Sequence, residues 1–496
     1  MSLVYCIAIL MAGGVLALLL KQRQAARMVS LIAVVLAAIP VLPLVSQGFG
    51  LVPAGPELNL DDSQWLAAIS VSWIEPLGVR FLLAADGFSL SLILLTLFLG
   101  ITAILAAWEE IQDQAGFFYF NLMWTLAGVV GVFTALDLLL FFFFWEVMLI
   151  PMFFIISIWG HENKRYAALK FFIYTQASSL LLLISIWVLV IGHYQLTQQW
   201  TFSWFELVNG ESLPYGLWIM LGFFVAFVVK LPGVPFHNWL PDAHTQAPTP
   251  GSVILAGILL KTGAYGLIRF VPSLFPIEAQ QFAPMAMGLG VISVLYGAKL
   301  AFGQLDIKRM IAYSSISHMG FVLIATFTWN AIALQGAAIQ LLAHGLSSAG
   351  LFALAGTLQH KLHTRDIRRL GGLWQQTPRM GAVGLFFVLA ALGMPGLGNF
   401  IGEFLVLLGA FKVAPVVAIF AAAGMILAPV YALHIMQRTF HGEPQVAHPV
   451  PPTDFGRREM VMMGTLMVGL LILGLAPFLV LDLTAPTMAW MVASIQ

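Results

Sequence analysis

Charged residues and cysteine are scarce in this sequence. Only 9% of its 496 residues are charged, whereas ordinary soluble domains contain roughly 25%. The single cysteine, Cys6, excludes a cysteine-ligated iron–sulfur cluster and a disulfide framework on this chain. Neither a Walker-type loop nor a strand-borne GxGxxG motif occurs. A net charge of zero gives no indication of a nucleic-acid partner. We therefore expect no cofactor or metal on this chain.

The sequence contains long apolar runs, which predict an all-α, multi-pass membrane protein. Hydrophobic residues make up 60% of the chain, and its mean hydropathy is +0.94. A helix needs about 20 apolar residues to cross the bilayer, so the runs predict about fourteen spans. These are residues 2–20, 28–46, 87–108, 117–135, 136–159, 166–192, 214–240, 247–270, 282–304, 309–328, 331–358, 379–411, 413–438 and 459–481. The first run lacks a basic leader, which favours a retained span over a cleaved signal peptide.

Basic residues gather on alternate loops, as the positive-inside rule requires. If the N-terminus lies outside, the inner loops hold Lys21, Arg23, Arg27, Lys164, Arg165, Lys308, Arg309, Lys361, Arg365, Arg368, Arg369, Arg379, Arg438, Arg457 and Arg458. The outer loops hold little beyond Arg80, Arg269 and Lys412. This asymmetry predicts that both termini face away from the cytoplasm, or from the matrix if the membrane were organellar. We expect a bacterial-type inner membrane with both termini on its outer side.

Two proline breaks indicate an internal repeat. Leu231-Pro232-Gly233 interrupts one predicted span, and Met394-Pro395-Gly396 interrupts another five spans later. Because five is odd, the second copy would be inverted, and inverted repeats with broken helices are a transporter architecture. We predict three N-terminal spans with an outer hairpin segment in residues 1–116, five-helix repeats in 117–270 and 271–440, and an inner loop with the last span in 441–496.

Ionisable side chains inside the predicted spans are the main functional signal. Four charged residues sit well inside spans, Glu146, Lys230, Lys261 and Glu403, and the histidines His318 and His344 are likewise deep in theirs. At a rise of about 1.5 Å per residue, Glu146 lies about 15 Å from the start of its span and Lys261 about 16 Å beyond Pro250, both near mid-depth. Four lipid-exposed charges would cost on the order of 10 to 14 kcal/mol, so these groups must face the interior. There they could relay protons, or they could be fixed pairs that only hold helices together.

In the proton-relay interpretation, the two helix breaks near these charges allow the helices to move and let water approach the charged groups. Pro232 cannot bond the carbonyl of Val228, and Pro395 leaves that of Ala391 free, so both breaks are expected to recruit water.

Three polar residues between the two lysines form a candidate proton-uptake group. His237, Asp242 and His244 lie in or near the loop that follows the first break. A capping or packing role is the alternative for the two histidines.

Several segments together resemble the antiporter-like subunits of proton-pumping NADH:quinone oxidoreductase, respiratory complex I. They read LPGVPFHNWLPDAHTQAPTPGSVILAGILLKTGAYGLIR, FFFFWEVMLIPMFF, KRMIAYSSISHMG, HGLSSAGLFALAG and RDIRRLGGLW, and the likeness covers essentially the whole chain. Glu403 stands where other members of the group have a lysine. The sequence also ends soon after its last apolar run, without the long lateral helix of subunit L.

The resemblance implies fourteen helices with two inverted five-helix repeats and assigns roles within them. Glu146 and Lys230 would form a modulating ion pair, and Lys261 would be the next relay group. His318 and His344 would link the two halves, with Glu403 as the terminal group.

The resemblance also implies partners and an energy source. Flavin, iron–sulfur clusters and quinone would belong to partner subunits, and subunits L and N would be neighbours in the membrane arm. Quinone reduction elsewhere in the complex would drive proton translocation through this chain.

Two other functions compete with this one. Subunits of a multisubunit cation/proton antiporter share these motifs and would co-purify with several small membrane proteins. A purely structural arm segment would tolerate a charge swap between Glu146 and Lys230 but lose assembly in Lys230→Ala.

Overall fold

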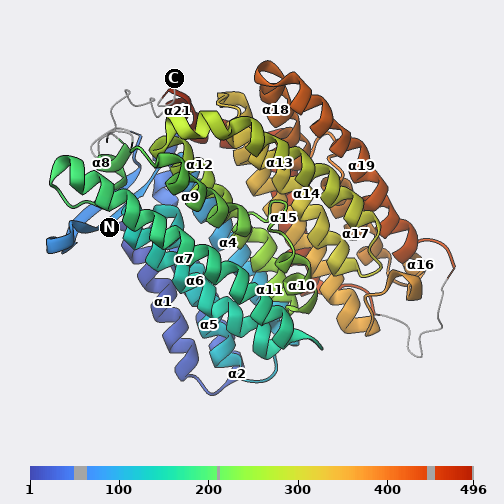
Figure 1. The fold of residues 1–496 in the computed structure, drawn as a ribbon. Helices are drawn as coiled ribbons and strands as arrows, with labels where there is room; N and C mark the ends of the chain where they lie inside the picture. Colours follow the sequence, from blue (N-terminus) through green and yellow to red (C-terminus); the bar gives the residue numbers. More distant parts are fainter. Residues whose placement is uncertain (50–63, 209, 211–212, 444–452, 494–496) are drawn as a thin grey trace.

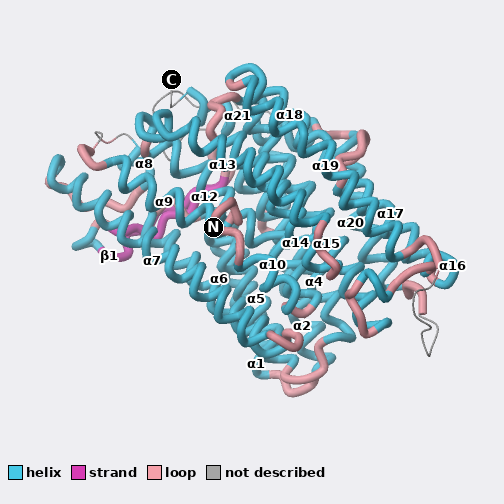
Figure 2. The backbone as a smooth tube through the Cα atoms, turned by 45° about the vertical axis from the view of Figure 1, so that its right-hand side comes forward, coloured by secondary structure: helices cyan, strands magenta, loops and turns pink. Residues whose placement is uncertain are grey.

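The computed structural model describes residues 1–49, 64–208, 210, 213–443 and 453–493, which form a bundle of helices (Figure 1). Among these residues, eleven helices are long and apolar enough to cross a membrane. Helices make up most of the described backbone (Figure 2). The predicted helical membrane fold is thereby confirmed. The count of fourteen spans stays a prediction, because residues 216–230, 378–391 and 478–493 form shorter apolar helices.

The N-terminal part consists of helices and one hairpin. Its elements are α1 (Ser2–Leu19), α2 (Arg23–Ala38), α3 (Leu42–Gly48), β1 (Ala67–Ile74), β2 (Val79–Ala85) and α4 (Gly87–Glu110). The strands β1 and β2 pair antiparallel, with Ala67 opposite Ala85, inside the segment where a hairpin is predicted.

The first broken helix follows in the next part of the chain. Its elements are α5 (Ala115–Thr134), α6 (Leu138–Trp159), α7 (Lys164–Thr197), α8 (Trp204–Val208), α9 (Gly216–Lys230), α10 (Trp239–Gln246), α11 (Thr249–Ile254), the π-helical turn η2 (Leu255–Leu259) and α12 (Leu260–Leu274). The break separates α9 from α10.

The second broken helix lies in the remaining part, between α17 and α18. The elements are α13 (Pro276–Phe302), α14 (Ile307–Thr326), α15 (Ala331–Leu362), α16 (Leu373–Gln376), α17 (Pro378–Ala391), α18 (Gly398–Val413), α19 (Pro415–Thr439), α20 (Arg457–Leu475) and α21 (Phe478–Ala493). Each break follows a long helix, α7 with 34 residues and α15 with 32. This order supports the predicted pair of repeats, which remains a prediction.

Aspartate side chains cap two of the helices that carry the predicted site, α6 and α14. Asp137 accepts hydrogen bonds from Leu139 N and Leu140 N, both at 3.0 Å, and so caps α6. Asp306 accepts from Arg309 N at 3.1 Å and caps α14. Such caps satisfy backbone N–H groups that have no partner inside the helix.

The first helix break differs from the sequence-based expectation. Gly233 N donates to Val228 O at 2.9 Å, so the carbonyl expected to be free is occupied. The chain turns tightly enough after Pro232 for the next N–H group to reach it. At the second break, Gly393 and Gly396 adopt φ of +79° and +94°, a backbone conformation that glycine allows without strain.

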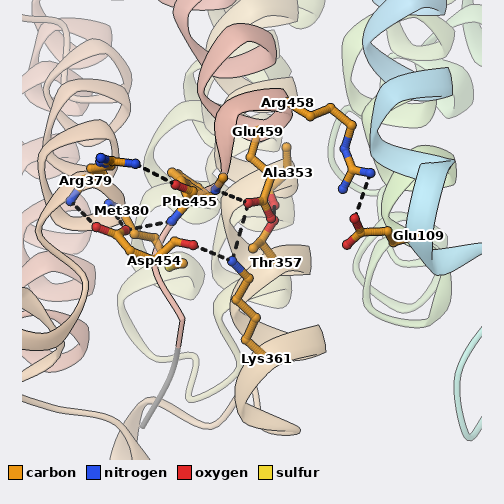
Figure 3. A network of polar contacts seen from close by, with 11 residues as sticks. Glu109, Ala353, Thr357, Lys361, Arg379, Met380, Asp454, Phe455, Arg458 and Glu459 are labelled. Atoms are coloured by element: carbon orange, nitrogen blue, oxygen red, sulfur yellow. Dashed lines mark hydrogen bonds and ion pairs between the residues drawn. The ribbon is translucent and has the colours of Figure 1, made fainter.

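We call the end of the bundle that carries residues 111–114, 160–163, 303–306, 440–443 and 453–456 the basic end. A polar network fastens α20 there (Figure 3). Asp454 accepts from Arg379 N and Met380 N, both at 2.9 Å, and thereby caps α17 from a distant segment. Lys361 Nζ donates to Asp454 O at 2.9 Å.

Removal of this distant cap should loosen the basic end. Asp454→Ala is expected to lower the stability of the chain by about 0.5–2 kcal/mol, the usual effect of losing a helix cap. Thermal melting of the purified protein in detergent measures the change. The exposed Asp482, replaced by alanine, is the control, and equal melting temperatures for the two variants would contradict the capping role.

Candidate functional site

The predicted relay residues lie deep inside the bundle. Five of them are at most 3% exposed: Lys230, Lys261, His318, His344 and Glu403. The sixth, Glu146, is partly buried. None of the six therefore has to place an uncompensated charge fully against lipid, as the insertion cost requires.

Lys261 is held by a carbonyl and a histidine from two different helices. It follows the π-helical turn η2, a type of irregularity that is frequent at functional sites. Its Nζ donates to Ala256 O, within that turn, at 2.6 Å and lies 2.8 Å from His344 Nδ1. When Lys261 donates, His344 Nδ1 accepts, so the neutral ring carries its proton on Nε2. The two groups are therefore in direct contact for proton transfer.

Glu403 and His318 form a second contact between buried titratable groups. His318 Nδ1 lies 2.7 Å from Glu403 Oε1, a distance typical of a charge-assisted hydrogen bond. Gln340 Nε2 donates to the same oxygen at 3.0 Å, and Tyr431 Oη lies 3.3 Å from His318 Nε2. The carboxylate and the imidazole are thus both oriented by neighbouring side chains.

The two pairs meet between α14 and α15. The rings of His318 and His344 lie 5.5 Å apart between centroids, at an interplanar angle of 53°. Lys261, His344, His318 and Glu403 therefore form a continuous line of buried titratable groups, which we call the central relay.

Gln340 and Tyr431 are functional candidates that the sequence did not identify. Gln340 precedes His344 by four residues and so shares its face of α15, a spacing that could have indicated it. Tyr431 comes from α19, and only the packing of that helix places it beside His318.

Lys230 and Glu146 are not joined as predicted. Neither Lys230 Nζ nor Glu146 Oε1 has a hydrogen-bond partner among the described residues. The ammonium lies instead over the rings of Trp145 and Phe171, at 5.1 and 5.8 Å from their centroids. The charge of Glu146 still acts on Lys230 through space. The predicted ion pair is therefore open in this structure, because aromatic faces provide the lysine with cation–π contacts.

The three predicted uptake residues are separated from one another by their contacts. Asp242 forms ion pairs with Lys170 at 2.6 Å and with Arg309 at 3.4 Å. The ring of His237 lies 5.4 Å from that of Tyr296. Only His244, which is fully buried, faces the charges of the central relay.

Fully buried His244 has unused hydrogen-bonding capacity. Its ring stacks on Phe352 with centroids 4.4 Å apart. Neither ring nitrogen has a hydrogen-bond partner among the described residues. Buried polar atoms of this kind are usually satisfied by water, so a water-filled contact is expected beside it.

Three basic residues assigned to loops, Arg27, Arg269 and Lys308, are in fact buried in helices. Lys308 is 0% exposed in the first turn of α14, and Arg269 is 1% exposed in α12. Arg269 Nη2 pairs with Asp86 Oδ2 at 2.5 Å. The assignment failed because hydropathy places a residue along a helix but does not say which neighbours cover it.

No group of three or more histidine, cysteine or acidic residues is placed to hold a metal ion in the described part of the chain.

Comparisons with known proteins give one consistent relationship. The family "NADH:quinone oxidoreductase/Mrp antiporter, TM" matches residues 135–428. NADH-quinone oxidoreductase subunit M of Pseudomonas aeruginosa is 52% identical over 434 residues, covering 86% of this chain and 85% of that protein. Its counterpart in Escherichia coli K12 is 52% identical over 429 residues, with 84% of each chain covered.

Solved structures agree in fold. A chain of respiratory complex I from Thermus thermophilus with bound NADH superposes with a TM-score of 0.87, at 29% identity and full coverage of both chains. A chain of the Mrp complex from Dietzia sp. shares the fold, with a TM-score of 0.81 at 18% identity, covering 100% of this chain and 98% of that one. These similarities confirm the resemblance indicated by the sequence motifs.

Proposed function

Because this chain belongs to the NADH:quinone oxidoreductase and Mrp antiporter transmembrane family, we propose that it is a proton-translocating membrane subunit of an NADH:quinone oxidoreductase. Its relatives at 52% identity are named as subunit M of that enzyme. Redox chemistry then takes place on partner subunits that hold flavin, iron–sulfur clusters and quinone. Quinone reduction there drives proton movement here.

The central relay is the observation that carries this function. It places four buried titratable groups one after another through the bundle, in the order Lys261, His344, His318 and Glu403. A structural role alone would require paired charges. The Lys261 ammonium instead contacts a carbonyl and an imidazole, and no carboxylate lies within ion-pair distance of it among the described residues.

Proton transfer follows the contacts of the relay. As the Lys261 Nζ–H bond breaks, a bond forms to His344 Nδ1, and His344 releases its Nε2 proton on its other side. That proton passes to His318, across the 5.5 Å between the rings, through a bridging water molecule. His318 then protonates Glu403 through their 2.7 Å contact, and the carboxyl group holds the proton for release.

Glu146 and Lys230 act as an adjustable pair that modulates this route. Bringing Glu146 closer to Lys230 favours the charged lysine, and withdrawing it favours proton release. Lys230 already lacks hydrogen bonds, so a small displacement changes its electrostatic environment strongly. The breaks at Pro232 and Pro395 permit such displacements within α9–α10 and α17–α18. His237, Asp242 and His244 remain proposed uptake residues.

The protein's surroundings follow from the same assignment. It crosses a bacterial-type inner membrane with both termini on the outer side, so the basic end faces inward. Subunits L and N are its proposed neighbours in the membrane arm.

A multisubunit cation/proton antiporter is the second candidate, supported by the fold shared with the Mrp complex. Co-purification separates the two functions. Partners that carry flavin and iron–sulfur clusters support the oxidoreductase, whereas a set of small membrane subunits without them supports the antiporter.

Substitution at the adjustable pair tests the proposed function directly. Lys230→Ala and Glu146→Gln should each lower NADH-driven proton uptake into inverted vesicles by about 10²-fold, as expected for lost proton-transfer groups. The complex should still assemble. Normal uptake in both variants would refute the proposal, and a full rescue by the swapped pair Glu146→Lys with Lys230→Glu would favour a structural role.

A further inference from the structure

Polar cavities open at the basic end beside the connection between α6 and α7. One, of 280 Å³, is lined by Glu110, His161, Gly356, Gln359, His360 and His363. A second, of 480 Å³, shares His161 and adds acidic and basic side chains such as Asp306 and Arg365. We call the two together the vestibule. Its size and polar walls suit water molecules.

Lys308 contacts the wall of the vestibule through His161. Its Nζ is 3.4 Å from His161 Nε2 and donates to Ala247 O at 3.2 Å. Glu110 in the vestibule wall and Asp306 act on it electrostatically, but no carboxylate lies within ion-pair distance of it in the described part of the chain. A cation kept only for packing would be expected to have a direct counter-ion. Lys308 contacts a titratable imidazole instead.

His161 can pass protons between water and Lys308. Burial, together with the positive charge of Lys308, lowers the pKa of His161 to about 3. The ring is therefore neutral near pH 7, and a neutral imidazole both accepts and donates a proton. His161 lines both cavities and also contacts the buried ammonium of Lys308.

His244 continues the line from Lys308 to the central relay. It lies on α10, and Ala247 O, directly after that helix, accepts from Lys308 Nζ at 3.2 Å. Its ring stacks on Phe352 of α15, the helix that also carries His344. Its two ring nitrogens have no partner among the described residues, so donor and acceptor positions are free between the two helices.

We propose that protons reach the central relay from the vestibule through His161, Lys308 and His244, without passing the Glu146–Lys230 pair. In each step one bond to hydrogen breaks as an N–H bond forms. The Lys308 ammonium gives a proton to His244, the resulting amine takes a proton from His161, and His161 takes its replacement from the water of the vestibule. A proton from His244 then enters the Lys261–His344 pair. This route rests on the proposed function. It assigns proton uptake to residues other than Glu146 and Lys230, the pair that modulates the central relay.

Lys308→Arg separates a relay from a structural cation. Arginine keeps the positive charge but cannot release a proton. In the intact complex, this variant should assemble and lose about 10²-fold of its NADH-driven proton uptake. The exposed Lys299, replaced by arginine, is the matched control and should pump normally. Wild-type uptake in Lys308→Arg would overturn the route.

A second variant decides the matter even if Lys308→Arg does not assemble. His161→Ala should lose proton uptake, and imidazole added to the medium should restore it, because the vestibule can admit the free base. Failure of imidazole to restore uptake, or normal uptake without it, would overturn the route. Glu403→Gln measured in parallel distinguishes the two failures: if it also pumps normally, the proposed function itself is wrong.

Discussion

Lys261→Met is expected to give an assembled complex in which proton uptake falls by about 10²-fold or more, the usual effect of removing a proton-transfer group. Methionine has a similar volume and removes a buried charge, so packing should survive. His344 Nδ1 loses its 2.8 Å contact with the lysine. A buried acceptor left without a partner costs about 1–3 kcal/mol, which is small beside the stability of an assembled complex.

The measurement is fluorescence quenching by NADH-energised inverted vesicles, with assembly checked by native electrophoresis. The exposed Lys412, replaced by methionine, controls for the loss of a lysine. Uptake that matches the control would place Lys261 outside the proton route. Loss of assembly would show that its contacts with Ala256 and His344 are mainly structural.

Glu403→Gln should have an effect of the same size for a different reason. Glutamine can still accept the hydrogen bond from Gln340 and keep its place beside His318. It cannot hold a transferable proton, so the last step of the relay stops while its geometry persists. We expect proton uptake to fall by about 10²-fold with little change in assembly.

Glu403→Asp and the exposed Glu206→Gln are the controls for this variant. The aspartate keeps the titratable group on a shorter side chain and should retain part of the uptake. Glu206→Gln should behave as the wild type. Equal uptake in Glu403→Gln and Glu206→Gln would exclude the carboxyl group from the route.

Much of the central relay could be predicted from the sequence. An ionisable residue isolated in an apolar run can be recognised because its insertion into lipid costs free energy. The rise per residue of a helix then gives the depth of that residue in the membrane. Lys261, His344, His318 and Glu403 were predicted on this basis, and the structure brings them into line.

The side chains that each of these residues contacts on neighbouring helices could not be predicted in the same way. The sequence places Glu146 and Lys230 inside spans, but only packing shows that aromatic rings lie over the ammonium. Lys308 has the position of an inner-loop residue in the sequence, and only the fold shows that it is buried and contacts His161 and Ala247. Gln340 and Tyr431 are neutral, so the cost argument does not reveal them.

The number of protons translocated per NADH oxidised, counted in proteoliposomes, tests the central claim most directly. The comparison is between the wild-type complex and Glu403→Gln, with NADH oxidation measured in the same samples. If protons cross through the central relay, the variant must give a lower ratio while its residual NADH oxidation remains quinone-dependent. An unchanged ratio would contradict the claim.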